Sequence, residues 1–198
     1  ELTPLVSIGD HVNVGQKIAD SDAFMSVPVH SSVSGTVTDI KPHIHPNGTQ
    51  VNSIFVENDN LYTIDESVKP ISDIDSMSKD DLLKVVREKG LVGMGGAGFP
   101  TFIKLNPNKK IDYLLVNGAE CEPYLTSDYR EMMEEPEKLI GGLKIVLQMF
   151  PKAKGLICIE DNKPDAADVL RGMLTPEDNI EVKLLKAKYP QGAERNLV

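Results

Sequence analysis

Four glycines within six residues form the stretch of this sequence whose composition best suits ligand binding: Gly93, Gly95, Gly96 and Gly98. Glycine lacks a β-carbon and accepts positive φ angles, so the N–H groups of such a loop can converge on one phosphate. Gly93, Gly95 and Gly98 also match the pattern G-x-G-x-x-G. That pattern marks a dinucleotide-binding fingerprint only after a strand, and here the preceding residues are predicted to be helical. The loop is therefore interpreted as a phosphate site of another kind.

A short helix is predicted directly after the loop, over residues 101–105. Its N-terminus would add its dipole to the N–H groups of the loop, and Lys104 would lie about one turn along it, within reach of an anion. The alternative is a tight connection between two packed helices. We favour the phosphate site, because so many glycines cost more conformational entropy on folding than a simple connection requires.

Polar clusters follow three apolar runs that are predicted to be buried parallel strands. The strands are predicted over residues 110–117, 155–159 and 180–185, and the clusters over 117–122, 160–163 and 191–195. The carboxyl ends of parallel strands share one edge of a sheet, where ligands bind in open α/β folds, although each cluster could also be a solvated turn. A glycine loop at the same edge would complete a nucleotide pocket, with the phosphate in the loop and Asn and Glu side chains bonded to the ring or ribose. Phe99 could stack on a flat ring or serve as a core anchor.

The elements that would position these residues alternate between strands and helices. Ser78 with Asp81 three residues later is a helix N-cap signal, and Gly90 is a natural C′ residue. Further helices are predicted from residue 126, over 135–150 with Pro136 near the first position, and over 165–174. This order predicts a three-layer α/β domain with a mainly parallel sheet over residues 77–198, after a polar linker over 61–76.

Residues 1–60 are predicted to form a small all-β domain, because short alternating runs are separated by turn residues. The phrases GDHVNVGQ at 9–16 and SVSGTV at 32–37 resemble the biotinyl/lipoyl-like barrel-sandwich hybrid family. That family carries its cofactor on a hairpin lysine, and the corresponding hairpin here, residues 23–26, has none. We therefore expect a structural barrel. His43 and His45 could be two metal ligands, but no third ligand is evident nearby, so a surface loop and no metal site are predicted.

Composition sets the broad class. The chain has 198 residues, 40% of them hydrophobic and 26% charged, as in a soluble globular protein. A net charge of −9 argues against a nucleic-acid partner, and no apolar run approaches the roughly 20 residues that span a bilayer. Two cysteines are too few for an iron–sulfur or four-cysteine zinc site. A reducing, cytoplasmic setting is expected, and the chain reads as an excised fragment because it begins and ends within a pattern.

Three motifs together resemble the RnfC subunit of the Rnf-type ion-translocating electron transport complex. They are GLVGMGGAGFPT at 90–101, NGAECEPY at 117–124 and YPQGAER at 189–195. The same motifs are similar to the FMN- and NADH-binding 51 kDa subunit of respiratory complex I. The resemblance covers nearly the whole chain, and a preceding barrel also suits the RnfC subunit.

The resemblance implies that the chain is the NADH-oxidising, FMN-binding electron-input part of a ferredoxin:NAD oxidoreductase. It implies partner subunits in a membrane complex and a peripheral place on the cytoplasmic side of the cell membrane. Two [4Fe–4S] clusters are expected in the longer protein but not in this piece. The cofactor-binding residues implied or located by the motifs are Gly93, Gly95, Gly96, Gly98 and Lys104 for the FMN phosphate and ribose, Asn117 and Glu120 for the flavin, Phe99, Glu122 and Glu194 for NADH, and Gly192 within the third motif.

Two other functions are kept as alternatives. One is a lipoyl- or biotinyl-type carrier module attached to an α/β partner, which the missing hairpin lysine opposes. The other is a cobalamin-reductase-like flavoprotein with the same flavin domain, which the N-terminal position of the barrel opposes.

Overall fold

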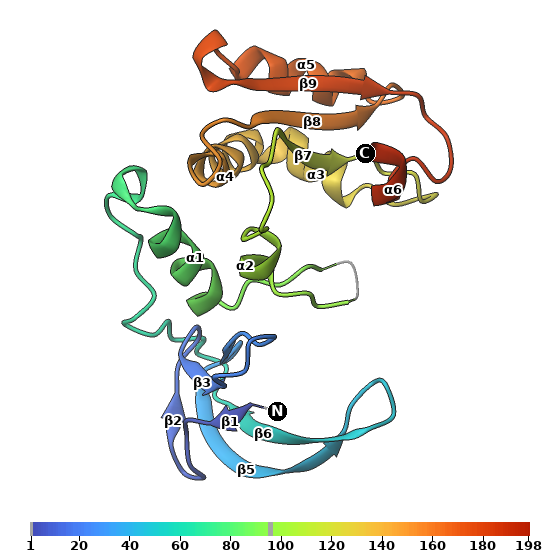
Figure 1. The fold of residues 1–198 in the computed structure, drawn as a ribbon. Helices are drawn as coiled ribbons and strands as arrows, with labels where there is room; N and C mark the ends of the chain where they lie inside the picture. The colour runs from blue at the N-terminus through green and yellow to red at the C-terminus, as the bar shows by residue number, and fades with distance from the viewer. Residues whose placement is uncertain (1, 95–96) are drawn as a thin grey trace. The chain divides into compact units, whose positions relative to one another are not determined.

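The computed structural model describes residues 2–94 and 97–198. The chain forms two compact units, Glu1–Pro107 and Asn108–Val198, whose helices and strands are labelled in Figure 1. The domain limits predicted from the sequence, with a linker over residues 61–76, remain a prediction.

The first unit begins with two antiparallel sheets of three strands each. Buried side chains from both sheets, Val12, Ile18 and Val37, form one small core. The sheets consist of β1 (Thr3–Pro4), β3 (Lys17–Asp20) and β4 (Val29–His30) in that order, and of β2 (His11–Val12), β5 (Gly35–Ile44) and β6 (Gln50–Asn58) in that order. The predicted all-β domain is confirmed.

Alternation along β5 shows why these residues form a half-buried strand. Val37 is buried while Thr36 and Thr38 on either side of it are exposed, because successive side chains point to opposite faces. The connection from β3 to β4 contains the hairpin that carries a cofactor lysine in lipoyl-like domains. Its tip exposes Phe24 and Met25 instead, and no lysine lies in it.

Helix α1 (Lys79–Glu88) begins and ends where the sequence predicts. The Ser78 hydroxyl accepts a hydrogen bond from the Asp81 N–H, which satisfies one of the free donors of the first turn. At the other end, Gly90 adopts a φ of 69°, the left-handed conformation that glycine tolerates best. Leu82 and Leu83 are the buried face of the helix.

Charged side chains hold the C-terminal end of α1 against β3. The Arg87 guanidinium donates to Asp20 Oδ1 at 3.0 Å and to the Ser21 carbonyl oxygen at 2.7 Å. Lys17 pairs with both Asp20 and Glu88. This network anchors the helix directly before the glycine loop. A single turn of helix, α2 (Thr101–Lys104), follows that loop as predicted.

The second unit is an α/β domain with a parallel sheet, as predicted. Strands β7 (Tyr113–Gly118), β8 (Lys154–Glu160) and β9 (Ile180–Leu185) pair in sequential order. The helices are α3 (Ser127–Glu134), α4 (Pro136–Gln148), α5 (Pro164–Met173) and the short α6 (Glu194–Leu197), with 3-10 turns at Ile74–Ser76 in the first unit and Pro176–Asp178 in the second. Pro136 and Pro164 each occupy the first helical position, where no N–H donor is needed.

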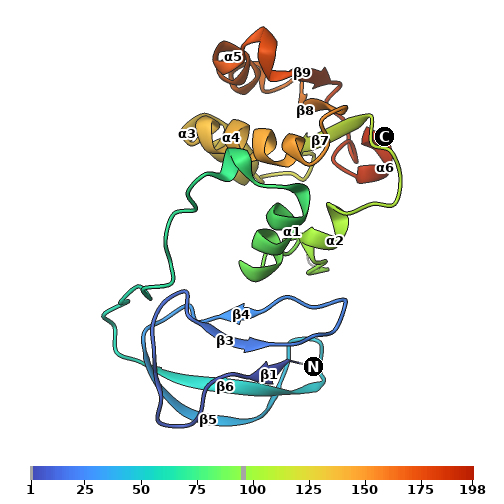
Figure 2. The same ribbon diagram turned by 60° about the vertical axis from the view of Figure 1, so that its left-hand side comes forward.

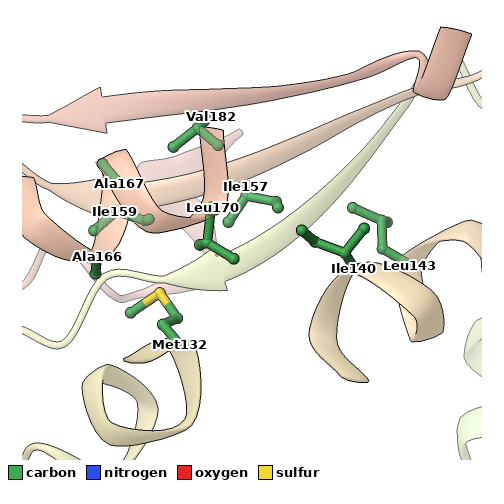
Figure 3. Packing of buried hydrophobic residues seen from close by; sticks show 9 residues of the cluster. All are labelled: Met132, Ile140, Leu143, Ile157, Ile159, Ala166, Ala167, Leu170 and Val182. Carbon is green, nitrogen blue, oxygen red and sulfur yellow. The ribbon is translucent and has the colours of Figure 1, made fainter. Parts of the chain in front are cut away.

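One buried cluster fastens the helices to this sheet. Ile157 and Ile159 of β8 and Val182 of β9 meet side chains of α3, α4 and α5, as Figure 3 shows. The helical members of the cluster are Met132, Ile140, Leu143, Ala166, Ala167 and Leu170. Their burial removes apolar surface from water and is the main stabilising term of the unit.

The three helices of this cluster lie on the same side of the sheet (Figure 2). The reason is topological, because right-handed crossovers between strands in sequential order place every connecting helix on one face. The described part of the second unit therefore has two layers, a helical layer and a sheet, and the predicted third layer is not among its described residues. Within the described ranges, no helix has the length and apolar character needed to cross a bilayer.

Candidate functional site

The glycine-rich stretch is the tip of a narrow hairpin, residues 91–100, which we call the glycine hairpin. Its base is closed by hydrogen bonds from Gly93 N–H to the Phe99 carbonyl at 2.8 Å and from Thr101 N–H to the Leu91 carbonyl at 3.0 Å. Val92 and Pro100 pair across it as an antiparallel bridge. The Gly93 N–H is thus used within the hairpin. Gly95 and Gly96 lie outside the described residues.

The remaining residues predicted here are open to solvent. Gly98 has a φ of 59°, and a β-carbon added to it would meet no atom within 4 Å, so the backbone there is accessible to a ligand. Phe99 is 42% exposed, which disfavours a core anchor, and Met94 is almost fully exposed. Lys104 is an exposed residue at the end of α2. The dipole expected from this helix is not supported, because α2 has only four residues.

At the carboxyl ends of the parallel strands the second unit has a cavity of about 350 Å³, which we call the strand-end cavity. Three separate segments line it, so the predicted convergence of polar clusters at one sheet edge is observed for β7, β8 and β9. The lining consists of residues 120–125, Glu160, Asn162, Lys163 and residues 187–189. Of the predicted residues, Glu120 and Glu122 line this cavity.

Glu120 is almost completely buried, with a side chain only 3% exposed. Oε1 accepts from the Asp128 N–H at 2.8 Å, while Oε2 accepts from the Tyr129 N–H at 3.1 Å and from Lys163 Nζ at 2.5 Å. Burial alone would raise the pKa of Glu120, but the bond from Lys163 and those from the two N–H groups outweigh it and lower that pKa. The carboxylate is ionised and fully engaged within the protein.

Asn117 and Gly192 tie the last loop of the chain to the end of β7. Asn117 Nδ2 donates to the Gly192 carbonyl at 2.8 Å, and Asn117 Oδ1 accepts from the Ala119 N–H. The Gly192 N–H donates to Cys121 Sγ at 3.2 Å. The loop therefore closes on β7 through Asn117, Cys121 and Gly192, while Glu194 is exposed at the start of α6.

Glu160 and Lys163 belong to the cavity although the sequence assigned them no defined role. Glu160 is 2% exposed, and its Oε1 accepts from the Lys188 N–H at 3.3 Å. The Lys163 side chain is 14% exposed and lies near the ring of Tyr129. Their place in a polar cluster after a strand was the only sequence signal for either residue.

The two histidines considered as metal ligands lie on or beside the β5–β6 hairpin. His43 packs edge-on against Phe55, with ring centroids 5.5 Å apart. His45 lies in the turn, where its N–H and the Thr49 carbonyl are 2.8 Å apart. Across residues 2–94 and 97–198, no group of three or more potential metal ligands is found.

Comparison with protein families matches both parts of the chain. Residues 86–198 match the Nuo51 FMN-binding domain, and residues 1–61 match the RnfC barrel sandwich hybrid domain.

Curated relatives cover the chain almost completely. It is 45% identical, over 99% of its length, to the RnfC-type subunit of the Na(+)-translocating ferredoxin:NAD(+) oxidoreductase complex of Acetobacterium woodii, and covers 45% of that protein. It is 41% identical, again over 99% of its length, to the corresponding subunit of the proton-translocating complex of Clostridium ljungdahlii and covers 43% of it. The equivalent subunit of an ion-translocating oxidoreductase complex of Haemophilus influenzae is 37% identical over 98% of the chain, which covers 30% of it. The chain thus spans less than half the length of these relatives.

Among solved structures, an NAD+-reducing [NiFe]-hydrogenase in the air-oxidized state aligns with a TM-score of 0.51 and 23% identity. The alignment covers 65% of this chain and 25% of the hydrogenase chain. At that identity the likeness concerns the fold alone.

Proposed function

The chain belongs to the family of the Nuo51 FMN-binding domain, and from this we propose that it binds FMN and NADH within the RnfC subunit of an Rnf-type ferredoxin:NAD oxidoreductase. The observation that carries the proposal is the meeting of three strand ends at one cavity. This is the edge at which open α/β sheets bind nucleotides.

The glycine hairpin suits an FMN phosphate. Its exposed tip includes Gly98, where the absence of a β-carbon leaves open space beside the backbone. The ammonium group of Lys104, on the next element of the same unit, would neutralise part of the phosphate charge. Gly93 supports the hairpin through its bond to Phe99, so we assign it a shaping role beside Gly95 and Gly96.

The strand-end cavity suits the flavin and nicotinamide side of the site. Its lining includes the exposed carboxylate of Glu122, which can accept hydrogen bonds from ribose hydroxyls. The residues proposed to hold or frame the two ligands here are Asn117, Glu120, Glu122, Gly192 and Glu194, with Phe99 from the glycine hairpin.

When bound, FMN supplies a ring that accepts a hydride from nicotinamide and releases electrons one at a time. The residues of this chain bind, orient and shield; none is assigned a proton-transfer role. The Gly192 loop and the loop after β7 form the walls, and the glycine hairpin supplies the phosphate contacts. In the longer protein the electrons would pass to iron–sulfur clusters.

The relatives also suggest the setting of the chain. They are subunits of ion-translocating complexes, so we propose that this chain joins partner subunits at the cytoplasmic side of a membrane. It would associate peripherally, through those partners.

A fluorescence titration of FMN against the chain tests the proposal. We expect saturable quenching with weak affinity, and about tenfold weaker binding for Lys104→Ala, since one charge-assisted bond to phosphate would be lost. Lys84→Ala is the matched control, because Lys84 is 76% exposed on the outer face of α1. No saturable quenching, or equal affinities for the two lysine variants, would contradict the assignment.

A further inference from the structure

A buried ion pair joins the exits of two neighbouring strands beside the strand-end cavity. Glu120 lies two residues after β7, and Lys163 lies three residues after β8 at the start of α5. Their side chains are 3% and 14% exposed, and Oε2 and Nζ are 2.5 Å apart. A pair as buried as this is seldom neutral to its surroundings, since removing one partner leaves an uncompensated charge.

Glu120 also provides the N-terminal cap of α3. Thr126 occupies the N-cap position of that helix but its side chain makes no capping bond. The Glu120 carboxylate accepts from the second and third residues of the helix instead, Asp128 and Tyr129. It therefore satisfies two of the free donors of the first turn and places a negative charge at the positive end of the helix.

Tyr129 links the same group to α5. Its hydroxyl donates to Asp165 Oδ2 at 2.5 Å, and its ring centroid lies 5.9 Å from Lys163 Nζ. Glu120, Lys163, Tyr129 and Asp165 thus form a closed set of contacts, which we call the Glu120 cluster. It connects β7, β8, α3 and α5 at one end of the sheet.

The Glu120 cluster fixes both ends of a loop that lines the cavity. Residues 121–126 run from Glu120 to α3, and Glu122 and Tyr124 within them line the cavity. Tyr124 has a φ of 66° and a fully exposed side chain, so the middle of this loop has few contacts of its own. Its conformation must be held from the two ends.

We infer that Glu120 and Lys163 are positioning residues, whose ion pair and cap hold loop 121–126 in the shape that binds a dinucleotide or flavin. The inference rests on the proposed function for its ligand. It gives Glu120 a role in place of the direct flavin contact that the sequence resemblance implies, because both of its oxygen atoms are already engaged.

Amide hydrogen exchange and FMN titration of the chain together test this role. Lys163→Met keeps the length of the side chain but removes its charge, and Lys163→Arg restores a cation. We expect exchange at residues 121–129 to accelerate about tenfold in Lys163→Met and FMN affinity to fall by about the same factor. Lys163→Arg should return both quantities toward the parent values. Lys152→Met, an exposed lysine before β8, should change neither.

Each other outcome has a definite meaning. Unchanged exchange in Lys163→Met would overturn the positioning role, and faster exchange with unchanged FMN affinity would overturn its link to the site. If the parent chain binds no FMN, the proposed function fails, while the exchange data still decide whether the ion pair holds the loop. Should Lys163→Met not fold, Glu120→Gln replaces it, because the amide oxygen can still cap α3 while the ion pair is lost.

Discussion

A β-carbon at position 192 would lie 2.3 Å from the carbonyl oxygen of Ala119, so Gly192 packs directly against the backbone that leaves β7. Atoms of real side chains do not approach a backbone oxygen so closely, and only glycine fits. Because Asn117 and Cys121 also bond to Gly192, this contact is the point at which the last loop closes over the strand-end cavity.

Gly192→Ala is expected to destabilise the chain by about 1–3 kcal/mol, the usual cost of inserting a methyl group into a closely packed site. The loop would have to move away from Ala119, which would also open the cavity. Thermal unfolding followed by circular dichroism measures the effect. Gly142→Ala serves as the control, since a β-carbon at this exposed position in α4 meets nothing within 4 Å. There the better helix propensity of alanine should stabilise by up to about 1 kcal/mol. Equal shifts in the two variants would refute the packing argument.

Arg87→Met is expected to lower the free energy of unfolding by about 1–3 kcal/mol, because hydrogen bonds to charged groups contribute more than neutral ones. Arg87 and Asp20 are both less than one quarter exposed, so solvent screens their contact only in part. Urea unfolding gives the measurement. Lys84→Met, which removes an exposed pair with Asp81, should change stability by no more than about 0.5 kcal/mol. A larger loss for Lys84→Met than for Arg87→Met would argue against an anchoring role of the network.

The two cysteines should differ sharply in reactivity. Cys158 is 3% exposed, and its burial raises the pKa of its thiol, so little thiolate is accessible there. Cys121 is half-buried at the cavity. A disulfide exchange reagent should therefore modify one thiol in the folded chain and the second only after unfolding in denaturant. The fast reaction should disappear in Cys121→Ser; its persistence would place the accessible thiol at Cys158 instead.

Glu181 gives a prediction for the dependence of stability on pH. Lys154 and then Lys183 lower the pKa of its carboxyl group to about 2 from an ordinary value of 4.5. A carboxyl whose pKa is lowered in the folded state stabilises that state above the unfolded pKa and loses the effect as pH falls through the folded one. The melting temperature of the parent should exceed that of Glu181→Gln near pH 7, and the difference should shrink between pH 4.5 and 2.

Salt separates this effect from others. Glu181 is exposed, so the difference should be small and should fall further at about 1 M salt, where the screening length is only about 3 Å. A difference that grows on acidification, or is insensitive to salt, would show that the two lysines are not its cause.

Much of the local structure follows from the sequence. The cap at Ser78, the left-handed Gly90 and the proline at the start of α4 depend on neighbours within a few residues, so they can be read directly. The apolar runs that became β7, β8 and β9 are also local signals. Their alternation with helices predicted the parallel sheet, and hence the meeting of polar clusters at one edge.

The use of each side chain at that edge depends on tertiary contacts. Glu120 reads as a ligand contact in the sequence, but its partners, Lys163 and the first amides of α3, come from distant or unforeseen positions. Gly192 reads as part of a binding motif, yet it lies against Ala119, 73 positions earlier in the numbering. The single helical layer likewise results from strand order, which residue spacing does not encode.

Sequence by itself determined the class of each unit, the ends of its main helices and the edge of the sheet where polar groups collect, because these follow from periodicity and from contacts between near neighbours. Only the tertiary structure decided which of those groups are spent on one another. A buried carboxylate must be paired wherever the fold brings a donor to it, and that donor is chosen by packing rather than by position in the chain.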